Sequence, residues 1–544
     1  MARYMPSPRR PYRKKLSAGF LVGRLGQAPK NRNLAKTLAS SGPMNSSPHR
    51  YGAAHPNKSN TVALAINVLL VGVVCLQVWL LTASLDTALG GDRSIVWPSF
   101  YGSLLLFLLS TSLLRYLPAP VRLPRPEVRA EAFPNTALAW RTLGISLFSL
   151  TISFCVWFMW SALVVQLPAA GFKLQPFQLF WLTATPTVLG SLLRVPYGLI
   201  VSRFGSRRSF AFVMLLMVIP CIGTALAVSN PATPFPVLLF WAGITGIAGA
   251  VFATSSAVVA LWFPKQLQGL ALGINGVGNI GITVAQLSAP ALFAATLFPF
   301  LPWIRPLGPH AFHLANIGLF WIPFILAATL AIWFGTKDFV MESRTLGSQL
   351  KVCRDNNTWY LSVLYFLTFG CVVAMSSSLP LIIQRIFAQA PGGAPDPLFW
   401  PAICAGAATV VRPLGGLLAD RLGPSRVTTA GVAVMAIGGF SLSQFLQPTD
   451  FFGFIMTVLV VCVAAGIGNG SIFKMIPLVN PREASAMIGI VSCLGAFGGF
   501  VPPLLLGYCF SAFGSPAWAY TWMAVFAMLC TGLSLWVYVR PGKY

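Results

Sequence analysis

FWLTATPTVLGSLLRVPYGLIV, residues 180–201, is an apolar stretch that holds one arginine, Arg194. A second apolar stretch, LFWPAICAGAATVVRPLGGLLA at residues 398–419, holds Arg412 in the matching place, and a basic turn follows each stretch. An arginine near the middle of a membrane helix costs about 2.5–3.5 kcal/mol on insertion scales, so each needs a partner of opposite charge. All eleven Asp and Glu residues fall in loops or at the ends of the expected spans. We therefore expect an anionic ligand to supply the missing negative charge.

A purely structural role is the alternative for these arginines. Either side chain could donate to backbone carbonyls that Pro196 or Pro413 leaves free, because proline has no amide hydrogen to offer them. For a single arginine, a structural role and a ligand-binding role would be equally good explanations. Two arginines at matching positions, without an acid in any span, favour the ligand.

The composition indicates a protein that crosses a membrane many times. Of its 544 residues, 56% are hydrophobic and 9% are charged, and the mean hydropathy is +0.74. Soluble domains are typically about 25% charged, and an apolar run of about 20 residues can span a bilayer as a helix. We expect an all-α polytopic membrane protein with about fourteen transmembrane helices, near residues 61–83, 96–114, 142–166, 178–201, 209–228, 235–263, 269–298, 313–334, 359–383, 398–419, 428–446, 453–475, 484–510 and 517–538.

The distribution of positive charge predicts the topology, since cytoplasmic loops retain Lys and Arg. With both termini in the cytoplasm, 31 of the 37 Lys and Arg residues lie on that side, and two lie inside spans. Only Arg93, Lys173, Arg305 and Arg385 then face outward. We therefore attribute the net charge of +26 to multi-pass topology in a cell (inner) membrane and to contact with anionic lipid headgroups. The charge does not indicate nucleic-acid binding.

Residues suited to catalysis or metal binding are scattered. The ten cysteines form no C-x-x-C motif and nine of them lie in apolar runs, which is typical of packing residues. The four histidines lie in the N-terminal tail or in the loop before one span, at positions 49, 55, 310 and 313. We expect no metal, no cofactor and no enzymatic activity.

The chain divides into five expected regions. Residues 1–60 carry twelve Lys and Arg and no acid, which predicts a disordered basic cytoplasmic tail. A transit peptide is the alternative interpretation, and a translation start at Met44 would remove most of the tail. The other regions are an extra transmembrane hairpin at 61–115, a six-helix repeat at 142–334, a central cytoplasmic loop at 335–358 and a second six-helix repeat at 359–538.

Internal similarity relates the two sets of six spans. Arg194 and Arg412 are 218 positions apart, and Gly278 and Gly281 each lie 217 positions before Gly495 and Gly498. The offsets predict parallel repeats with a transport pathway along their shared interface.

The glycine-rich stretch GLALGINGVGNIGITVAQLSAP, residues 269–290, has two faces on a helical wheel. Small residues on one face, Gly278, Gly281 and Ala285, suit close packing between helices. The other face is polar and would be costly against lipid, so we expect it on the pathway; it comprises Gly276, Asn279, Thr283 and Gln286. The corresponding stretch in the second half of the chain, MIGIVSCLGAFGGFVPP, lacks Asn and Gln. The expected packing glycines are Gly273, Gly278, Gly281, Gly495, Gly498 and Gly499.

Several motifs carry a family resemblance. They are GINGVGNIGITVAQLSAP, GIVSCLGAFGGFVPP, GIGNGSIFKMIP, LLRVPYG and the turn GGLLADRLGPSR. The first two are similar to the nitrate-signature helices of the nitrate/nitrite porter family of the major facilitator superfamily, and the turn fits the superfamily pattern G-x-x-x-D-R-x-G-x-x-R. Residues 142–538 thus resemble this family, which implies the major facilitator fold and transport of nitrate and nitrite.

The resemblance also implies roles for individual residues. Arg194 and Arg412 match the two arginines that hold the anion, and Asn279 matches an asparagine near the substrate. The aromatic residues Tyr365, Phe369, Phe154 and Phe252 match walls of the site, although helically spaced aromatics are otherwise more often core residues. The basic turns are expected to act in topology and gating through Asp420, Arg421 and Arg203.

Two departures from the family pattern concern helix spacing. Ala250 and Val251 stand where the family often has Gly-Asn, and Ser492 replaces a frequent glycine.

Nitrate and nitrite suit two arginines, because the planar guanidinium presents a fork of donors that matches paired oxygens. Proton-coupled carriers usually relay the proton through a buried acid or histidine, and no span interior contains one. We therefore expect a nitrate/nitrite antiporter that works by alternating access and functions as a monomer. Nitrate/proton symport and a nitrate-sensing receptor remain alternatives.

Overall fold

The computed structural model describes residues 136–263, 265–338, 351–390, 393–446, 450–480 and 484–539, with the isolated positions 102 and 105. This part of the chain contains twelve helices long and apolar enough to cross a membrane, which confirms the all-α polytopic fold. The expected tail at 1–60, and the expected hairpin at 61–115 apart from those two positions, lie outside the described residues.

The first six spans run from Thr136 to Gly335, and most consist of two helical pieces. They are α5 (Thr136–Gln166), α6 and α7 (Pro176–Leu192, Arg194–Phe204), α8 and α9 (Ser206–Leu216, Val218–Ala227), α10 and α11 (Phe235–Ile244, Gly246–Trp262), α12, η2 and α13 (Lys265–Gly276, Val277–Ile280, Gly281–Ala294), and α14 and α15 (Asn316–Leu319, Trp321–Gly335).

Proline accounts for three of the breaks inside these spans. Pro196, Pro220 and Pro323 each lie three residues after the residue at which one piece gives way to the next. A proline cannot donate to the carbonyl four residues earlier, so the helical hydrogen-bond pattern is interrupted there. One of these breaks places Arg194 at the start of α7.

The last six spans are more continuous. They are α17 (Asn356–Ile386), α18 (Phe399–Leu422), α19 (Pro424–Gln444), α20 (Phe451–Val479), α21 and α22 (Ala484–Phe497, Val501–Phe513), and α23 with η4 (Ala517–Ser534, Leu535–Val539). A short 3₁₀ helix, η3 (Lys351–Arg354), precedes α17, and Asp355 caps α17 by accepting a 3.0 Å hydrogen bond from the backbone N–H of Asn357.

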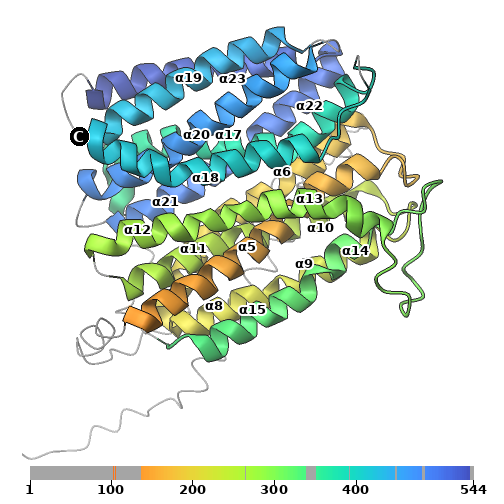
Figure 1. Ribbon diagram of the computed structural model, residues 1–544, viewed down its shortest axis with the longest axis horizontal. Coiled ribbons are helices and arrows are strands. Elements are labelled where there is room, and N and C mark those ends of the chain that lie inside the picture. The colour runs from red at the N-terminus through yellow and green to blue at the C-terminus, as the bar shows by residue number, and fades with distance from the viewer. Residues whose placement is uncertain are drawn as a thin grey trace, which may run out of the picture. The chain divides into compact units, whose positions relative to one another are not determined.

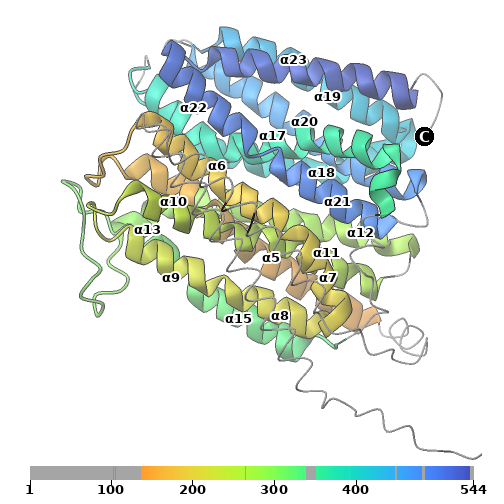
Figure 2. The same ribbon diagram turned by 180° about the vertical axis from the view of Figure 1, so that it is seen from behind.

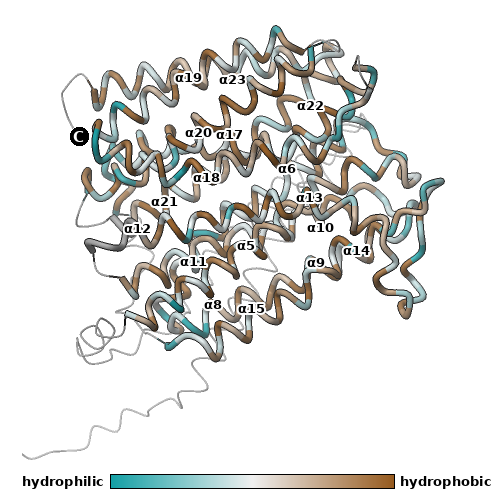
Figure 3. The backbone as a smooth tube through the Cα atoms, viewed as in Figure 1, coloured by the Kyte–Doolittle hydropathy of each residue, from teal (hydrophilic) through white to brown (hydrophobic). Residues whose placement is uncertain are grey.

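The two sets of six helices form two bundles that lie side by side (Figures 1 and 2). The equivalent first helices of the two bundles, α5 and α17, pack against each other. The fifth span of each bundle packs against the second span of the other: α13 contacts α18, and α21 and α22 contact α6. Hydropathy is high along the helix bodies and lower near their ends (Figure 3). We call the end with the turns at Gly205 and Gly423 the basic end, and the end where α5 and α17 finish the loop end.

The two basic turns have nearly the same backbone conformation. Gly205 has φ 93° and ψ 157°, and Gly423, 218 positions later, has φ 89° and ψ 131°. Residues other than glycine rarely adopt a positive φ. The shared conformation agrees with the expected repeat.

The glycine stripes pack each signature helix against the first helix of its own bundle. A side chain at Gly278 or Gly281 would press on Leu150 or Phe154 of α5, because its Cβ would lie 2.9 or 2.8 Å from them. In the second bundle, Cβ atoms at Gly495, Gly498 and Gly499 would overlap Tyr365, Phe366 and Val373 of α17. Gly273 differs from the prediction, because no neighbouring atom lies within 4 Å of a Cβ placed there.

Both signature spans are interrupted at these glycines, whereas the sequence predicts continuous spans. The first contains the 3₁₀ turn η2 at Val277–Ile280, and the second ends α21 at Phe497 before α22 begins at Val501. Glycine stabilises helices poorly because it loses the most backbone freedom on folding, so closely spaced glycines favour such breaks.

Candidate functional site

Arg194 lies at the boundary between the two bundles. Its side chain is 1% exposed, and its Nη1 donates a 2.9 Å hydrogen bond to the backbone carbonyl of Ser492 in α21. This carbonyl belongs to the other bundle and is not one that a proline in the arginine's own helix leaves free. Nε and Nη2 of Arg194 are buried and have no hydrogen-bond partner in the described part of the chain.

Arg412 approaches the boundary from the middle of α18. It is 8% exposed, and its Nη2 donates a 2.9 Å hydrogen bond to the hydroxyl oxygen of Tyr365 in α17. Its Nη1 is buried without a partner among the residues that the structure describes. Each guanidinium therefore donates a hydrogen bond from one nitrogen to a protein acceptor, and at least one further nitrogen has no partner in the described residues.

Phe369 connects the two arginines. The centroid of its ring lies 5.3 Å from Cζ of Arg194 and 5.8 Å from Cζ of Arg412. The ring of Tyr365 stacks on it, with centroids 5.2 Å apart and an interplanar angle of 2°. Phe252 approaches Arg194 most closely, at 4.9 Å from Cζ. The structure therefore brings together Arg194, Arg412, Tyr365, Phe369 and Phe252.

Two aromatic residues that the sequence did not single out complete this cluster. Trp157 lies 5.7 Å from Cζ of Arg194, and Phe473 lies 5.3 Å from Cζ of Arg412 and 5.0 Å from the ring of Tyr365. Aromatic faces attract cations at such distances. Phe473 is the last residue of GIGNGSIF, a motif that carries the family resemblance, so this motif could have pointed to it.

Phe154 takes a supporting position instead. It is fully buried, and its ring centroid is 5.3 Å from that of Trp157, at an interplanar angle of 67°. Its Cβ also faces Gly281 across the α5–α13 contact. Phe154 therefore holds Trp157, which in turn faces Arg194.

Asn279 lies in η2 and is 4% exposed, and its Oδ1 is buried without a hydrogen-bond partner in the described residues. Gly276, one turn earlier, faces Arg412 directly, since a Cβ at that position would lie 3.8 Å from Cζ of the arginine. The start of the polar stripe, at Gly276, therefore lies beside Arg412.

The other two residues of the polar stripe, Thr283 and Gln286, form hydrogen bonds between the two bundles on the side of the loop end. Thr283 donates a 2.9 Å hydrogen bond to the carbonyl of Ala402 in α18. Nε2 of Gln286 donates to the carbonyl of Ser376 in α17 at 2.7 Å and to Oγ of Ser161 in α5 at 3.3 Å. Pro380 leaves the carbonyl of Ser376 without its helical donor, so Gln286 meets an acceptor that would otherwise be unsatisfied.

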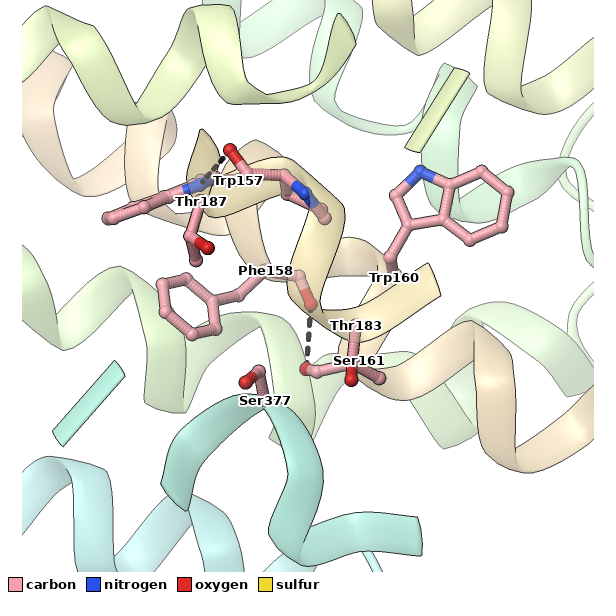
Figure 4. A pocket seen from close by; sticks show the side chains of 8 residues that line it. Trp157, Phe158, Trp160, Ser161, Thr183, Thr187 and Ser377 are labelled. Carbon is pink, nitrogen blue, oxygen red and sulfur yellow. Dashed lines mark hydrogen bonds between the residues drawn. The ribbon is translucent and has the colours of Figure 1, made fainter. Parts of the chain in front are cut away.

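A small cavity lies next to Trp157, between α5, α6 and α17 (Figure 4). Its volume is about 10 Å³, near the minimum that one water molecule needs, and the hydroxyl side chains of Ser161, Thr183, Thr187 and Ser377 line it. Nε1 of Trp157 donates to the carbonyl of Pro186 at 3.1 Å, which fixes the indole between the cavity and Arg194. No charged side chain lines this cavity.

The described acids lie away from the arginines. Asp338, Asp355, Asp396, Asp420 and Asp450 all occupy loops or helix ends. Every described acid therefore lies where the sequence predicts it, in a loop or at a helix end.

The residues expected in gating lie at the basic end. Asp420, in the last turn of α18, forms a 2.6 Å ion pair with Lys474 of α20, while Arg421 is exposed. Arg203 is half-buried, and burial lowers the pKa of its guanidinium. In the first bundle, Asp338 accepts from the backbone N–H of Arg207 at 3.1 Å and pairs with Nε of Arg208 at 3.2 Å.

Comparison with known proteins identifies relatives of most of the chain. The sequence profile of the Major Facilitator Superfamily matches residues 149–501, and that of a family of unknown function (DUF6755) matches residues 55–125. A probable nitrate/nitrite antiporter of Thermus thermophilus is 34% identical over 421 residues, which cover 75% of this chain and 94% of the relative. A nitrate/nitrite transporter of Escherichia coli is 35% identical over 437 residues, covering 74% and 92%.

Solved structures agree on the fold. A bacterial homologue of the human lysosomal transporter Spinster, in an inward-facing and unoccupied conformation, matches with a TM-score of 0.56 and 16% identity, covering 74% of this chain and 97% of that one. The human organic anion transporter MFSD10 matches with a TM-score of 0.54 and 14% identity, covering 73% and 99%.

Proposed function

Because the chain belongs to the nitrate/nitrite porter family of the major facilitator superfamily, we propose that it exchanges nitrate for nitrite across a cell membrane by alternating access. Arg194 and Arg412 hold the anion in this proposal. The protein acts as a transporter without catalytic activity, functions as a monomer and requires no cofactor.

One observation carries the proposal. Three guanidinium nitrogens, Nε and Nη2 of Arg194 and Nη1 of Arg412, are buried in the bundle interface without a hydrogen-bond partner among the described residues. A buried donor without a partner is costly, and a buried charge is more so. A small oxyanion would satisfy these donors with charge-assisted hydrogen bonds and would supply the counter-charge.

The neighbouring side chains suit the same ligand. Tyr365 fixes the orientation of the Arg412 fork through their hydrogen bond, and Phe369 and Phe252 cover the guanidinium faces. Aromatic walls exclude water, which strengthens the remaining polar contacts because the local dielectric constant is low. Asn279 would present its amide nitrogen to an anion oxygen, since the two amide atoms can exchange places by rotation of the side chain.

Exchange fits the energetics better than uptake of nitrate alone. Entry of one monovalent anion against an inside-negative potential costs about 2.3 kcal/mol per 100 mV, whereas exchange of nitrate for nitrite moves no net charge. An empty site would also have to carry two uncompensated arginines through a closed conformation, so the loaded carrier reorients more easily.

Proteoliposomes test the proposal. We expect labelled nitrate to enter rapidly when the vesicles contain nitrite or nitrate, and slowly when they contain no permeant anion, at fixed pH and zero potential. An imposed pH gradient should have little effect. Strong uptake into empty vesicles driven by external acid would contradict exchange and support nitrate/proton symport, and binding of nitrate without any flux would support a receptor.

The charge distribution supports a specific orientation in the membrane. We place the basic end, with the turns at Gly205 and Gly423, on the cytoplasmic side of a cell (inner) membrane, with both termini there as well. Positive charge is retained on the cytoplasmic side of membrane proteins, and these two turns carry SRFGSRR and DRLGPSR.

The tail is not needed for transport in this proposal. Deletion of residues 1–60 should leave the exchange rate per inserted molecule unchanged, because all the residues of the candidate site lie after residue 153. The measurement is nitrate counterflow normalised to the amount of protein in the vesicles. Loss of exchange in a correctly inserted deletion would show that the chain after residue 60 is not sufficient for transport.

A further inference from the structure

A second feature lies on the outside of the second bundle, away from the arginine site. It is a groove of about 690 Å³ formed by α18, α19 and α20. Eleven of its twelve lining residues are aliphatic or glycine, among them Leu418, Leu422, Val434 and Val460, whose side chains are 38–57% exposed. Because these helices are membrane spans, the groove opens toward the hydrocarbon of the bilayer.

Arg426 is the only charged residue that lines the groove. It is exposed, it lies in the first turn of α19 three residues after Gly423, and it forms no ion pair within the described part of the chain. The nearest acid in the sequence, Asp420, is already paired with Lys474 at 2.6 Å. The groove therefore combines a long apolar wall with an uncompensated cation at the basic end.

We infer that this groove binds an anionic phospholipid, with an acyl chain along α18 and α20 and the phosphate on Arg426. A guanidinium matches phosphate oxygens with paired charge-assisted hydrogen bonds. A lipid that spans both features satisfies the cation and covers the apolar wall at once, which neither a soluble anion nor hydrocarbon alone does.

The length of the groove supports a lipid as the occupant. Its walls extend from Leu422, in the last turn of α18, to Leu459 and Val460 in the first half of α20, and from Arg426 to Val434 in α19. Eight residues of helix correspond to about 12 Å, at about 1.5 Å per residue. This is a substantial part of the hydrocarbon depth of one bilayer leaflet, about 15 Å.

Native mass spectrometry of the purified full-length protein tests the inference. The delipidated protein is titrated with phosphatidylglycerol and, separately, with phosphatidylethanolamine that carries the same acyl chains. We expect one phosphatidylglycerol to be retained preferentially. Arg426→Gln should weaken its binding about tenfold, the effect of losing a charge-assisted hydrogen-bond pair, and should remove the preference.

Two further variants separate the parts of the site. Ala430→Phe fills the groove from an exposed position and should also reduce retention of phosphatidylglycerol, although every charge is kept. Arg354→Gln removes an exposed arginine that does not line the groove and should leave retention unchanged. Equal binding of the two lipids, or retention that neither Arg426→Gln nor Ala430→Phe alters, would overturn the inference. Thermal unfolding in detergent verifies that each variant is folded, and no outcome depends on nitrate transport.

Discussion

Replacement of either buried arginine by lysine is expected to remove most nitrate exchange and to weaken nitrate binding by about one to two orders of magnitude, because a hydrogen bond to a charged group contributes about 1.5–3 kcal/mol. Arg194 uses Nη1 on the carbonyl of Ser492 and keeps Nε and Nη2 for a ligand. Arg412 uses Nη2 on Tyr365 and keeps Nη1. Lysine retains the charge, but its single nitrogen cannot hold a rigid protein acceptor and a planar anion in the same geometry.

The measurements are equilibrium binding of nitrate in detergent and counterflow in proteoliposomes. Arg385→Lys is the matched control, because it makes the same chemical change in the last turn of α17, at the loop end. We expect this control to keep normal affinity. If Arg194→Lys or Arg412→Lys also binds nitrate normally, that arginine has a structural role and the two-arginine site is wrong.

Gly495→Ala is expected to reduce nitrate affinity about tenfold or more, although the substitution adds only one methyl group and touches no ligand in our proposal. A Cβ at this position would overlap the ring of Tyr365. The ring must then move, which breaks the hydrogen bond that orients Arg412 and disturbs the stacking on Phe369. Overpacking of this kind typically costs about 1–3 kcal/mol.

Gly489→Ala is the control in the same helix, because no neighbouring atom lies within 4 Å of a Cβ at Gly489. It should leave affinity unchanged and should stabilise α21 slightly, by about 0.5–1 kcal/mol, since alanine favours helix more than glycine does. Nitrate titration and thermal unfolding distinguish the two variants. Normal affinity in Gly495→Ala would mean that Tyr365 can move without harm to the site.

The two arginines of the candidate site could be predicted from the sequence because charged residues are unusual inside apolar runs. An arginine inside an apolar run is rare, and two at matching positions are rarer, so Arg194 and Arg412 could be identified without coordinates. Tyr365, Phe369 and Phe252 depended on the family resemblance. Trp157 was missed because aromatic residues are common in apolar helices, and only its proximity to a guanidinium distinguishes it.

The sequence by itself determined the fold class, the repeat and the absence of an acid from the span interiors, because apolar length, repeat offset and charge position are properties of the chain. Only the tertiary structure decided which donors are used within the protein and which remain free. Ser492, whose carbonyl binds Arg194, lies 298 residues away from it, and Tyr365 lies 47 residues from Arg412. Gly273 and Gly278 likewise look equivalent in the sequence, but only Gly278 faces a neighbouring helix closely. Hydrogen bonds and close packing depend on distances of a few ångströms between segments far apart in the chain, and the packing of the two bundles sets those distances.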